Sequence, residues 1–226
     1  MSGHEPRAGG RSSVTAFSMI DASDHFAARI GAAVGFAVAF LGVTAMVIGE
    51  FSSMKRIDES IMTGLARRRT DFIDAIVTPL ATFATLEPLT IQATIGFVMI
   101  VVTIGGSASL HFALAAVGSG FLSYLVKRMV GRPRPEGFHL VRGLRSFSYP
   151  SGDLLTASAI YLTIALVVSP HLPHSAARWL LFGIVTILLA LLAVCRVYVG
   201  VHYPSDVAGG AFLGLAWALF ISAWFA

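Results

Sequence analysis

The longest run without a charged side chain extends from Pro88 to Val126 and contains 39 residues. A helix needs about 20 mostly apolar residues to cross the hydrocarbon core of a bilayer, so this run is long enough for two spans. Gly105-Gly106-Ser107 at its centre predicts the break between them, with spans near 88–105 and 108–126. A chain that carries such a run is constrained to a membrane-spanning fold.

Four further apolar runs complete the set of expected spans: Ile30–Ile48, Leu154–Val168, Trp179–Cys195 and Val207–Ala226. Charged residues make up only 12% of the chain, whereas a soluble domain carries about 25%. The sequence therefore predicts an all-α, polytopic membrane protein with six transmembrane helices, forming one domain over residues 28–226. Residues 1–27 are polar, contain several glycines and serines, and are expected to form a disordered tail.

A basic amphipathic stretch, Lys55–Asp74, lies between the first two spans and includes Arg67, Arg68 and Arg69. A shorter apolar piece, Ala75–Leu86, follows it and contains Pro79. These features favour an interfacial helix followed by a re-entrant or buried segment that is broken at the proline. A seventh span is the alternative.

Three polar stretches adjoin the spans: Lys127–Pro135, Pro150–Asp153 and Arg196–Asp206. With six spans, the end of the third and the start of the fourth lie on the same side of the membrane. The end of the fifth and the start of the sixth lie on that side too. We therefore expect all three stretches to meet at one face, whichever way the protein is inserted.

The first two stretches suit an anion. Lys127 and Arg134 are accompanied by prolines that restrict the loop, and an arginine fork suits bidentate contact with phosphate. Simple anchoring to anionic headgroups is the alternative for such a basic cluster. Ser151, Gly152 and Asp153 open the fourth span, where a helix start offers free N–H groups to an anion. The same residues also fit an ordinary helix start, with Ser151 as N-cap and Asp153 in the first turn.

The third stretch contains a histidine and an acid four residues apart. Pro204 fits an early helix position, so Asp206 is expected in the first turn and His202 just before it. Asp206 could hold one ring nitrogen of His202 and leave the other free to attack or to transfer a proton. An interfacial histidine bonded to a capping aspartate is the alternative.

Together the three stretches resemble the signature of the type-2 phosphatidic acid phosphatase superfamily. The matching patterns are Lys127-x6-Arg134-Pro135, Pro150-Ser151-Gly152 and Arg196-x5-His202-x3-Asp206. The resemblance extends from about the second span to the C-terminal end of the sequence, and it agrees in order, spacing and position relative to the spans. It implies a six-helix membrane fold that hydrolyses phosphate esters or diphosphates without a metal or other cofactor.

The resemblance also implies roles for individual residues. His202 would be the nucleophile, forming a phosphohistidine intermediate, and Asp206 would orient it. Lys127, Arg134 and Arg196 would hold the phosphate oxygens, helped by Ser151 and the Gly152 N–H. It implies no role for Arg128 and Arg132, which lie between the fixed positions of the pattern.

Asp153 departs from the family pattern, which has a histidine there that protonates the leaving group. An aspartate near three cations should be ionised, and an ionised carboxylate has no proton to give. Either its surroundings keep it protonated, or the enzyme works without an acid, or the protein binds phospholipid without catalysis. The second case favours lipid diphosphates, because a phosphomonoester leaves as an anion that needs no proton. Cys195 stands where a serine is usual and is expected to be a packed thiol.

We therefore expect a membrane phosphatase acting on a lipid phosphate or diphosphate, with a polyprenyl diphosphate such as undecaprenyl diphosphate favoured. A lipid phosphotransferase and a non-catalytic phospholipid-binding protein are the alternatives. The expected partners are the lipid substrate and membrane lipids, with no nucleic acid, because the basic residues form no continuous patch. The resemblance places such an enzyme in a bacterial cytoplasmic (inner) membrane, with its site on the extracytoplasmic face. The basic residues at 55–69 oppose that orientation, since cytoplasmic loops are normally the basic ones.

Overall fold

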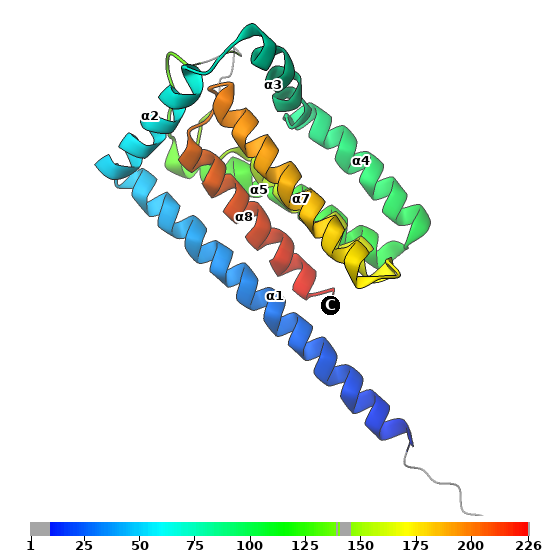
Figure 1. Cartoon of the computed structure of the whole chain (residues 1–226). Helices are drawn as coiled ribbons and strands as arrows, with labels where there is room; N and C mark the ends of the chain where they lie inside the picture. Colours follow the sequence, from blue (N-terminus) through cyan, green and yellow to red (C-terminus); the bar gives the residue numbers. More distant parts are fainter. Residues whose placement is uncertain (1–9, 139, 141–145, 226) are drawn as a thin grey trace, which may run out of the picture.

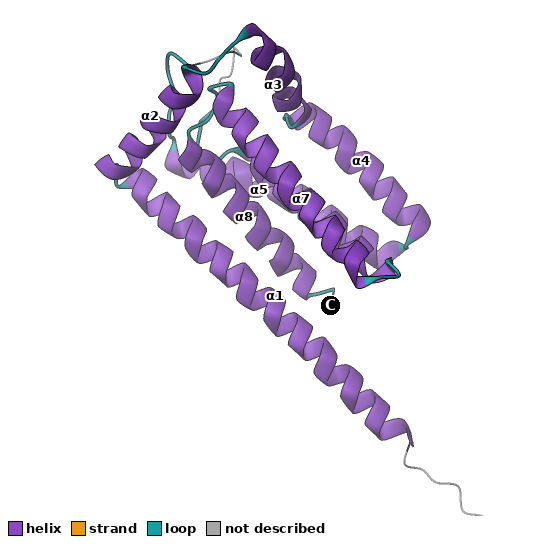
Figure 2. Ribbon diagram, in the orientation of Figure 1, coloured by secondary structure: helices purple, strands orange, loops and turns teal. Residues whose placement is uncertain are grey.

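The structure is a computed structural model that describes the backbone of residues 10–138, 140 and 146–225, with side chains from residue 24 onward in those ranges. Within these residues helices are the only regular elements (Figure 2), which confirms the all-α class. In chain order they are α1 (Gly10–Ile48), α2 (Ser52–Ala66), α3 (Asp71–Phe83), α4 (Leu86–Thr103), α5 (Gly106–Val130), α6 (Gly152–Val168), the 3₁₀ turn η1 (Ser169–His171), α7 (Ser175–Tyr198) and α8 (Pro204–Ala223).

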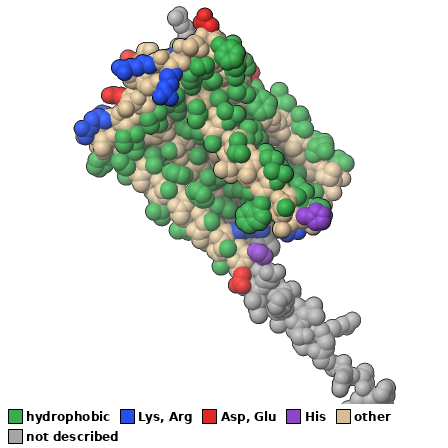
Figure 3. Space-filling model, viewed as in Figure 1, with side chains coloured by type: hydrophobic (Ala, Val, Ile, Leu, Met, Phe, Trp, Pro, Cys, Tyr) green, Lys and Arg blue, Asp and Glu red, His purple; other side chains and the backbone are tan. Residues whose placement is uncertain are grey.

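Six helical segments of the described chain are long and apolar enough to cross a membrane, which confirms the predicted number of spans. They are Asp24–Ile48 of α1, α4, α5, α6 with η1, α7 and α8. Hydrophobic side chains cover the side of the bundle in view, whereas several Lys and Arg side chains gather at the end where α2 lies (Figure 3). That distribution fits a bundle surrounded by lipid and capped by a polar end.

The segment between the first two spans differs from the expected single interfacial helix. Residues 67–70 break it into α2 and α3, and the Thr70 hydroxyl caps α3 by accepting a hydrogen bond from the Ile73 N–H at 3.2 Å. The prediction of a break at Pro79 is wrong, because α3 continues through it. A proline costs this helix one internal hydrogen bond, and the packing of Val77 and Leu80 against the end of α7 holds the helix together.

The described backbone is helical within the range predicted as a disordered tail, residues 1–27, because α1 begins at Gly10. Residues 11–27 contain neither proline nor glycine, so nothing in them stops the helix that the first span nucleates. Residues 1–9 lie outside the described part of the chain. In Figure 1 the blue end of α1 extends well beyond the other helices.

Helix α8 holds the bundle together by packing along both α1 and α6. It comes unusually close to α6 at two glycines. A side chain on Gly210 would collide with the Ser151 carbonyl, and one on Gly214 would collide with the Leu155 carbonyl. Small residues allow such close backbone approach between membrane helices. The contact brings the start of α8 beside the start of α6, where the Ser151 N–H donates to the Asp206 carbonyl at 2.9 Å.

The polar stretches meet at one end of the bundle, as the count of spans predicted. The end of α5, the start of α6, the end of α7 and the start of α8 all contribute to that end, and α2 and α3 lie there as well (Figure 1). At this end of the bundle, α5, α6, α7 and α8 extend two to four residues beyond the apolar runs that predicted them. The polar residues of interest therefore stand on ordered helix ends and the short loops that connect them.

Candidate active site

A cavity of about 590 Å³ opens at this end of the bundle. Six of the eight residues predicted for the site line it: Lys127, Arg134, Gly152, Asp153, Arg196 and His202. The two other predicted residues, Ser151 and Asp206, are buried next to it and do not line it. The structure thus brings together residues that lie up to 75 positions apart in the chain, and it places the His202 ring on the same cavity as the three cations.

Two of the cations are held by backbone carbonyl groups around the cavity. Lys127, in the last turn of α5, donates from Nζ to the Phe147 carbonyl at 2.7 Å. Arg134 donates to the Val201 carbonyl at 2.8 Å and, through two further nitrogens, to the carbonyl and hydroxyl of Ser146, both at 2.9 Å. These contacts fix the direction of each side chain before a ligand arrives.

Asp153 and Arg196 form an ion pair across the cavity, between the first turn of α6 and the last turn of α7. Arg196 also donates to the Ala81 carbonyl of α3 at 3.2 Å, which ties α3 to the site. The pair directs the Asp153 carboxylate at the Arg196 guanidinium. The neighbouring Cys195 is a buried free thiol, as expected for a packed residue.

The start of α6 lies at the cavity. Ser151 occupies the N-cap position as predicted, but its hydroxyl makes no capping bond, and its buried Oγ has no hydrogen-bond partner among the described residues. Gly152 is needed because a side chain there would meet Ser123 Oγ at 2.5 Å. Gly152 lines the cavity together with Lys127, and the first N–H groups of a helix have no partner within the helix.

His202 and Asp206 stand next to each other as predicted. The His202 Nδ1 lies 3.6 Å from Asp206 Oδ2, slightly beyond hydrogen-bond distance, and neither side chain is more than 1% exposed. Burial lowers the pKa of His202 to about 4, against the opposing effect of Asp206. The ring is therefore neutral at physiological pH. With Nδ1 directed at Asp206, Nε2 is the nitrogen left for a ligand.

Asp206 is held by three groups that sequence reasoning did not anticipate. Its Oδ2 accepts from the Tyr203 N–H at 2.8 Å and from the Ser148 hydroxyl. Its Oδ1 lies 2.7 Å from the Arg132 guanidinium. Asp206 therefore caps α8 and also faces the histidine.

Two more charged residues at this end make contacts that the sequence did not predict. Asp58 of α2 contacts Arg132 at 2.9 Å and is 1% exposed. A signal for it was present, because Asp58 lies four residues after Met54 and four before Met62, within the buried stripe of the amphipathic helix. Arg69 donates to the carbonyls of Phe138, at 2.8 Å, and of Tyr198, which joins the α2–α3 link to the end of α7.

Comparison with known proteins identifies relatives among membrane phosphatases. The chain is 38% identical to phosphatidylglycerophosphatase B of Bacillus subtilis over 95 residues, 42% of this chain and 46% of the relative. It is 35% identical to a lipid A 1-phosphatase of Rhizobium johnstonii over 123 residues, which cover 50% of this chain and 46% of the relative. It is 40% identical to an undecaprenyl-diphosphatase of Sulfolobus acidocaldarius over 77 residues, 34% of this chain and 32% of the relative. The matches thus span about half or less of these relatives.

Solved structures share the fold. The transmembrane PAP2-type phosphatidylglycerolphosphate phosphatase from Bacillus subtilis superposes with a TM-score of 0.78 at 25% identity, covering 85% of this chain and 95% of that chain. The LpxE structure from Aquifex aeolicus superposes with a TM-score of 0.56, covering 72% of this chain and 93% of that chain. The model of the PAP2 superfamily matches residues 108–226, more than half of the sequence, which include all three polar stretches. The chain therefore belongs to the PAP2 superfamily, the type-2 phosphatidic acid phosphatases.

Proposed function

We propose that this protein is a lipid phosphatase that hydrolyses a lipid diphosphate or monophosphate at one membrane face, with polyprenyl diphosphates preferred. The observation that carries the proposal is the cavity in which a neutral, buried His202 meets Lys127, Arg134 and Arg196 beside a free helix start. Relatives that act on phosphatidylglycerophosphate, lipid A and undecaprenyl diphosphate, according to their names, support this substrate class.

The reaction follows from the positions of these groups. The His202 Nε2 attacks phosphorus, the bond to the leaving oxygen breaks, and a phosphohistidine forms with its positive ring facing Asp206. Water then attacks phosphorus, the phosphorus–nitrogen bond breaks, and inorganic phosphate leaves with His202 neutral again. Lys127, Arg134 and the N–H groups at the start of α6 stabilise the charge on the phosphoryl oxygens in both steps.

Asp153 limits which leaving groups can depart, and so which lipids can be substrates. Because it is paired with Arg196, it cannot supply the proton that an alkoxide leaving group requires. A diphosphate releases a phosphomonoester instead, whose second pKa is about 6, so it departs as an anion. The cavity carries three cations against the two carboxylates of Glu87 and Asp153, and this positive balance stabilises that anion.

An apolar groove provides a place for the lipid chain. It has a volume of about 430 Å³ and lies between α4, α5 and α6, with walls formed mainly by Leu, Phe, Ala and Thr. Leu86, Leu89, Gly120 and Thr156 line both the groove and the polar cavity, so the two spaces adjoin. A lipid can then place its headgroup at His202 while its chain remains between helices, which supports sideways access from the bilayer.

The extracytoplasmic placement of this face remains part of the proposal. Lys55, Arg56 and Arg67–Arg69 lie at the same end of the bundle and oppose it on the positive-inside tendency. Arg69 is engaged by backbone carbonyls of the protein, so it has a structural use at this face that is independent of insertion. Labelling of a cysteine introduced at exposed Glu59 by a membrane-impermeant thiol reagent in intact cells determines the side.

Filling the junction between groove and cavity should select against long-chain substrates. A side chain on Gly120 would meet no atom within 4 Å, so leucine there projects into open space without disturbing the packing. We expect Gly120→Leu to raise KM for a polyprenyl diphosphate about tenfold and to leave hydrolysis of a water-soluble diphosphate ester unchanged. Gly183→Leu, on α7 and equally open, is the matched control. Equal kinetics of the two variants on the lipid would contradict the groove assignment.

The function itself is tested by phosphate release from a panel of lipid monophosphates and diphosphates in mixed micelles, with and without EDTA. We expect hydrolysis that EDTA does not inhibit, fastest on a polyprenyl diphosphate. A lipid alcohol added as acceptor separates hydrolysis from phosphotransfer, since transfer would consume it. Binding of these lipids without phosphate release would instead identify a non-catalytic phospholipid-binding protein.

A further inference from the structure

A network of buried charges links Asp206 to helix α2. One nitrogen of Arg132 contacts Asp206 Oδ1 and the Ser205 hydroxyl, both at 2.7 Å, and a second nitrogen contacts Asp58 Oδ2 at 2.9 Å. Asp58 also accepts from the Ser205 N–H at 2.9 Å and from the Ser205 hydroxyl at 2.5 Å. A single guanidinium thus bridges a carboxylate of α2 and the carboxylate that faces His202.

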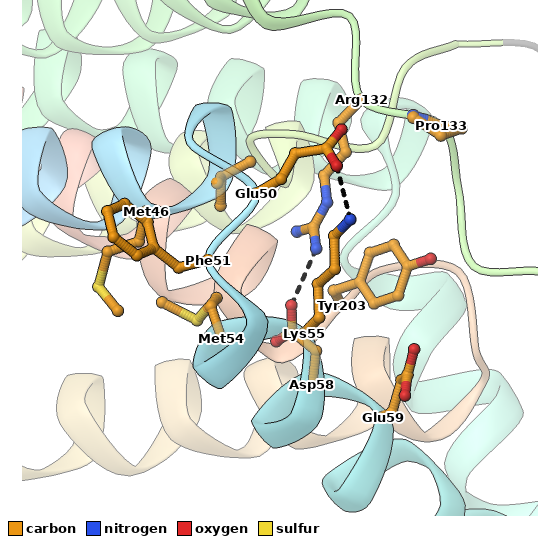
Figure 4. Close-up of a pocket in the computed structure, with 11 residues that line it drawn as sticks. Met46, Glu50, Phe51, Met54, Lys55, Asp58, Glu59, Arg132, Pro133 and Tyr203 are labelled. Atoms are coloured by element: carbon orange, nitrogen blue, oxygen red, sulfur yellow. Dashed lines mark hydrogen bonds and ion pairs between the residues drawn. The ribbon is translucent and has the colours of Figure 1, made fainter.

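The network lies apart from the cavity that contains His202. Figure 4 shows Arg132 reaching down to Asp58 beside the ring of Tyr203, over which the guanidinium lies 4.0 Å from the ring centroid. A second cavity, of about 320 Å³, adjoins these three residues and shares no lining residue with the first. Arg132 and Asp58 therefore do not line the cavity that contains His202, and the contact that joins them to the proposed catalytic pair is the one between Arg132 and Asp206.

Asp58 is an unusual residue to find on the buried face of the amphipathic helix α2. It is 1% exposed and lies in line with Met54 and Met62, where an apolar side chain would serve for packing alone. Removing two charges from water is costly unless every partner is satisfied, and replacing such a pair by apolar residues is often neutral or stabilising. Both carboxylate oxygens of Asp58 accept hydrogen bonds, from Arg132 and from Ser205. Arg132 also contacts Asp206, and Ser205 precedes Asp206 in the chain.

We infer that Asp58 and Arg132 are positioning residues for the catalytic pair, so that the seating of α2 on the bundle sets the orientation of Asp206. This inference rests on the proposed function of His202 and Asp206. The described contacts of Asp206 Oδ2 are those to Ser148, Tyr203 and His202, whereas Oδ1 meets Arg132. Arg132 is thus the group that holds Oδ1, and it leaves Oδ2 directed at the histidine.

The network should also affect the pKa of His202 through its charges. Arg132 offsets part of the negative charge of Asp206, and Asp58 offsets part of the positive charge of Arg132. Removing Arg132 should strengthen the attraction between Asp206 and a protonated His202, and so raise the pKa of His202. Removing the charge of Asp58 should instead lower the pKa of His202. The other charged groups that line the cavity with His202 are unchanged in both variants: Glu87 of α4, Lys127 of α5, Arg134 of the loop after α5, Asp153 of α6 and Arg196 of α7.

The test compares Asp58→Asn with Glu59→Gln, its neighbour on α2, which is exposed and lines the same second cavity. For Asp58→Asn we expect kcat to fall about 10- to 100-fold with little change in KM, since misplacement of a reacting group costs rate more than binding. The acid limb of the pH–rate profile should move to lower pH. Arg132→Gln should lower kcat and move the acid limb to higher pH, and Arg132→Lys should restore the limb and part of the rate.

Equal kcat and equal acid limbs for Asp58→Asn and Glu59→Gln would overturn the inference, as would Arg132→Gln and Arg132→Lys variants with identical profiles. If Asp58→Asn does not fold, the two Arg132 variants decide, because loss of folded protein lowers the rate without moving a pH limb. If the wild type hydrolyses no lipid, the proposed function is contradicted, and the kinetic comparison no longer tests the inference. The inference is then read from the titration of His202 by NMR of histidine-labelled protein, where the same opposite shifts are expected.

Discussion

Replacing His202 by alanine should lower phosphate release at least about 1,000-fold on every lipid that the wild type cleaves, because the variant lacks the proposed nucleophile. The ring has no hydrogen-bond partner for Nδ1 within the described structure, so its loss leaves no new unpaired group and the protein should remain folded. Phosphate release by purified protein in mixed micelles, with thermal unfolding as a check on folding, measures the effect. His174→Ala, an exposed histidine before α7 at the other end of the bundle, is the matched control.

The same reaction has a defined acid limit. Burial lowers the pKa of His202 to about 4, and only the neutral ring can attack phosphorus. The rate contribution of His202 is therefore fully present above that pKa and is lost as the pH falls through about 4. Rapid denaturation in alkali during turnover should also trap a labelled phosphohistidine in the wild type and none in His202→Ala. Activity that survives in His202→Ala would assign the chemistry to another residue.

Replacing Asp153 by histidine should raise the hydrolysis of lipid monophosphates about 10- to 100-fold relative to diphosphates, because it introduces a side chain that can protonate an alkoxide. It also frees Arg196 from its ion pair, so that the guanidinium can turn to the phosphate. Rates on phosphatidic acid and on a polyprenyl diphosphate, measured side by side, give the ratio. Asp153→Asn separates the two effects, since it frees Arg196 without supplying a proton.

Two results would contradict this account of Asp153. One is a wild-type protein that cleaves phosphatidic acid at least as fast as a polyprenyl diphosphate. The other is an Asp153→Asn variant that gains as much monophosphate activity as Asp153→His, which would show that only the charge at this position limits the rate.

Much of the architecture could be predicted from the sequence because it depends on lengths and on parity. Uninterrupted apolar runs gave the six spans, Gly105 marked the break between α4 and α5, and the even number of spans placed three polar stretches at one face. These inferences need no knowledge of which helix packs against which.

What escaped prediction depends on packing between distant parts of the chain. Asp58 and Arg132 are 74 residues apart, and the Asp153–Arg196 pair spans 43, so neither partner could be read from local pattern. Pro79 reads as a helix breaker, yet packing of α3 on α7 overrides that local preference. The extension of α1 to Gly10 likewise depends on continuation from an existing helix, which composition alone does not register.

The backbone contact between α6 and α8 at Gly210 and Gly214 has a consequence for a protein in a deformable solvent. Helices that touch through long side chains can slide or tilt when a bilayer thins or thickens, whereas two backbones in direct contact move as one body. The start of α6 at the cavity and the Asp206 carboxylate both belong to that body. The geometry on which the proposed reaction depends should thereby change little when the lipid around it changes.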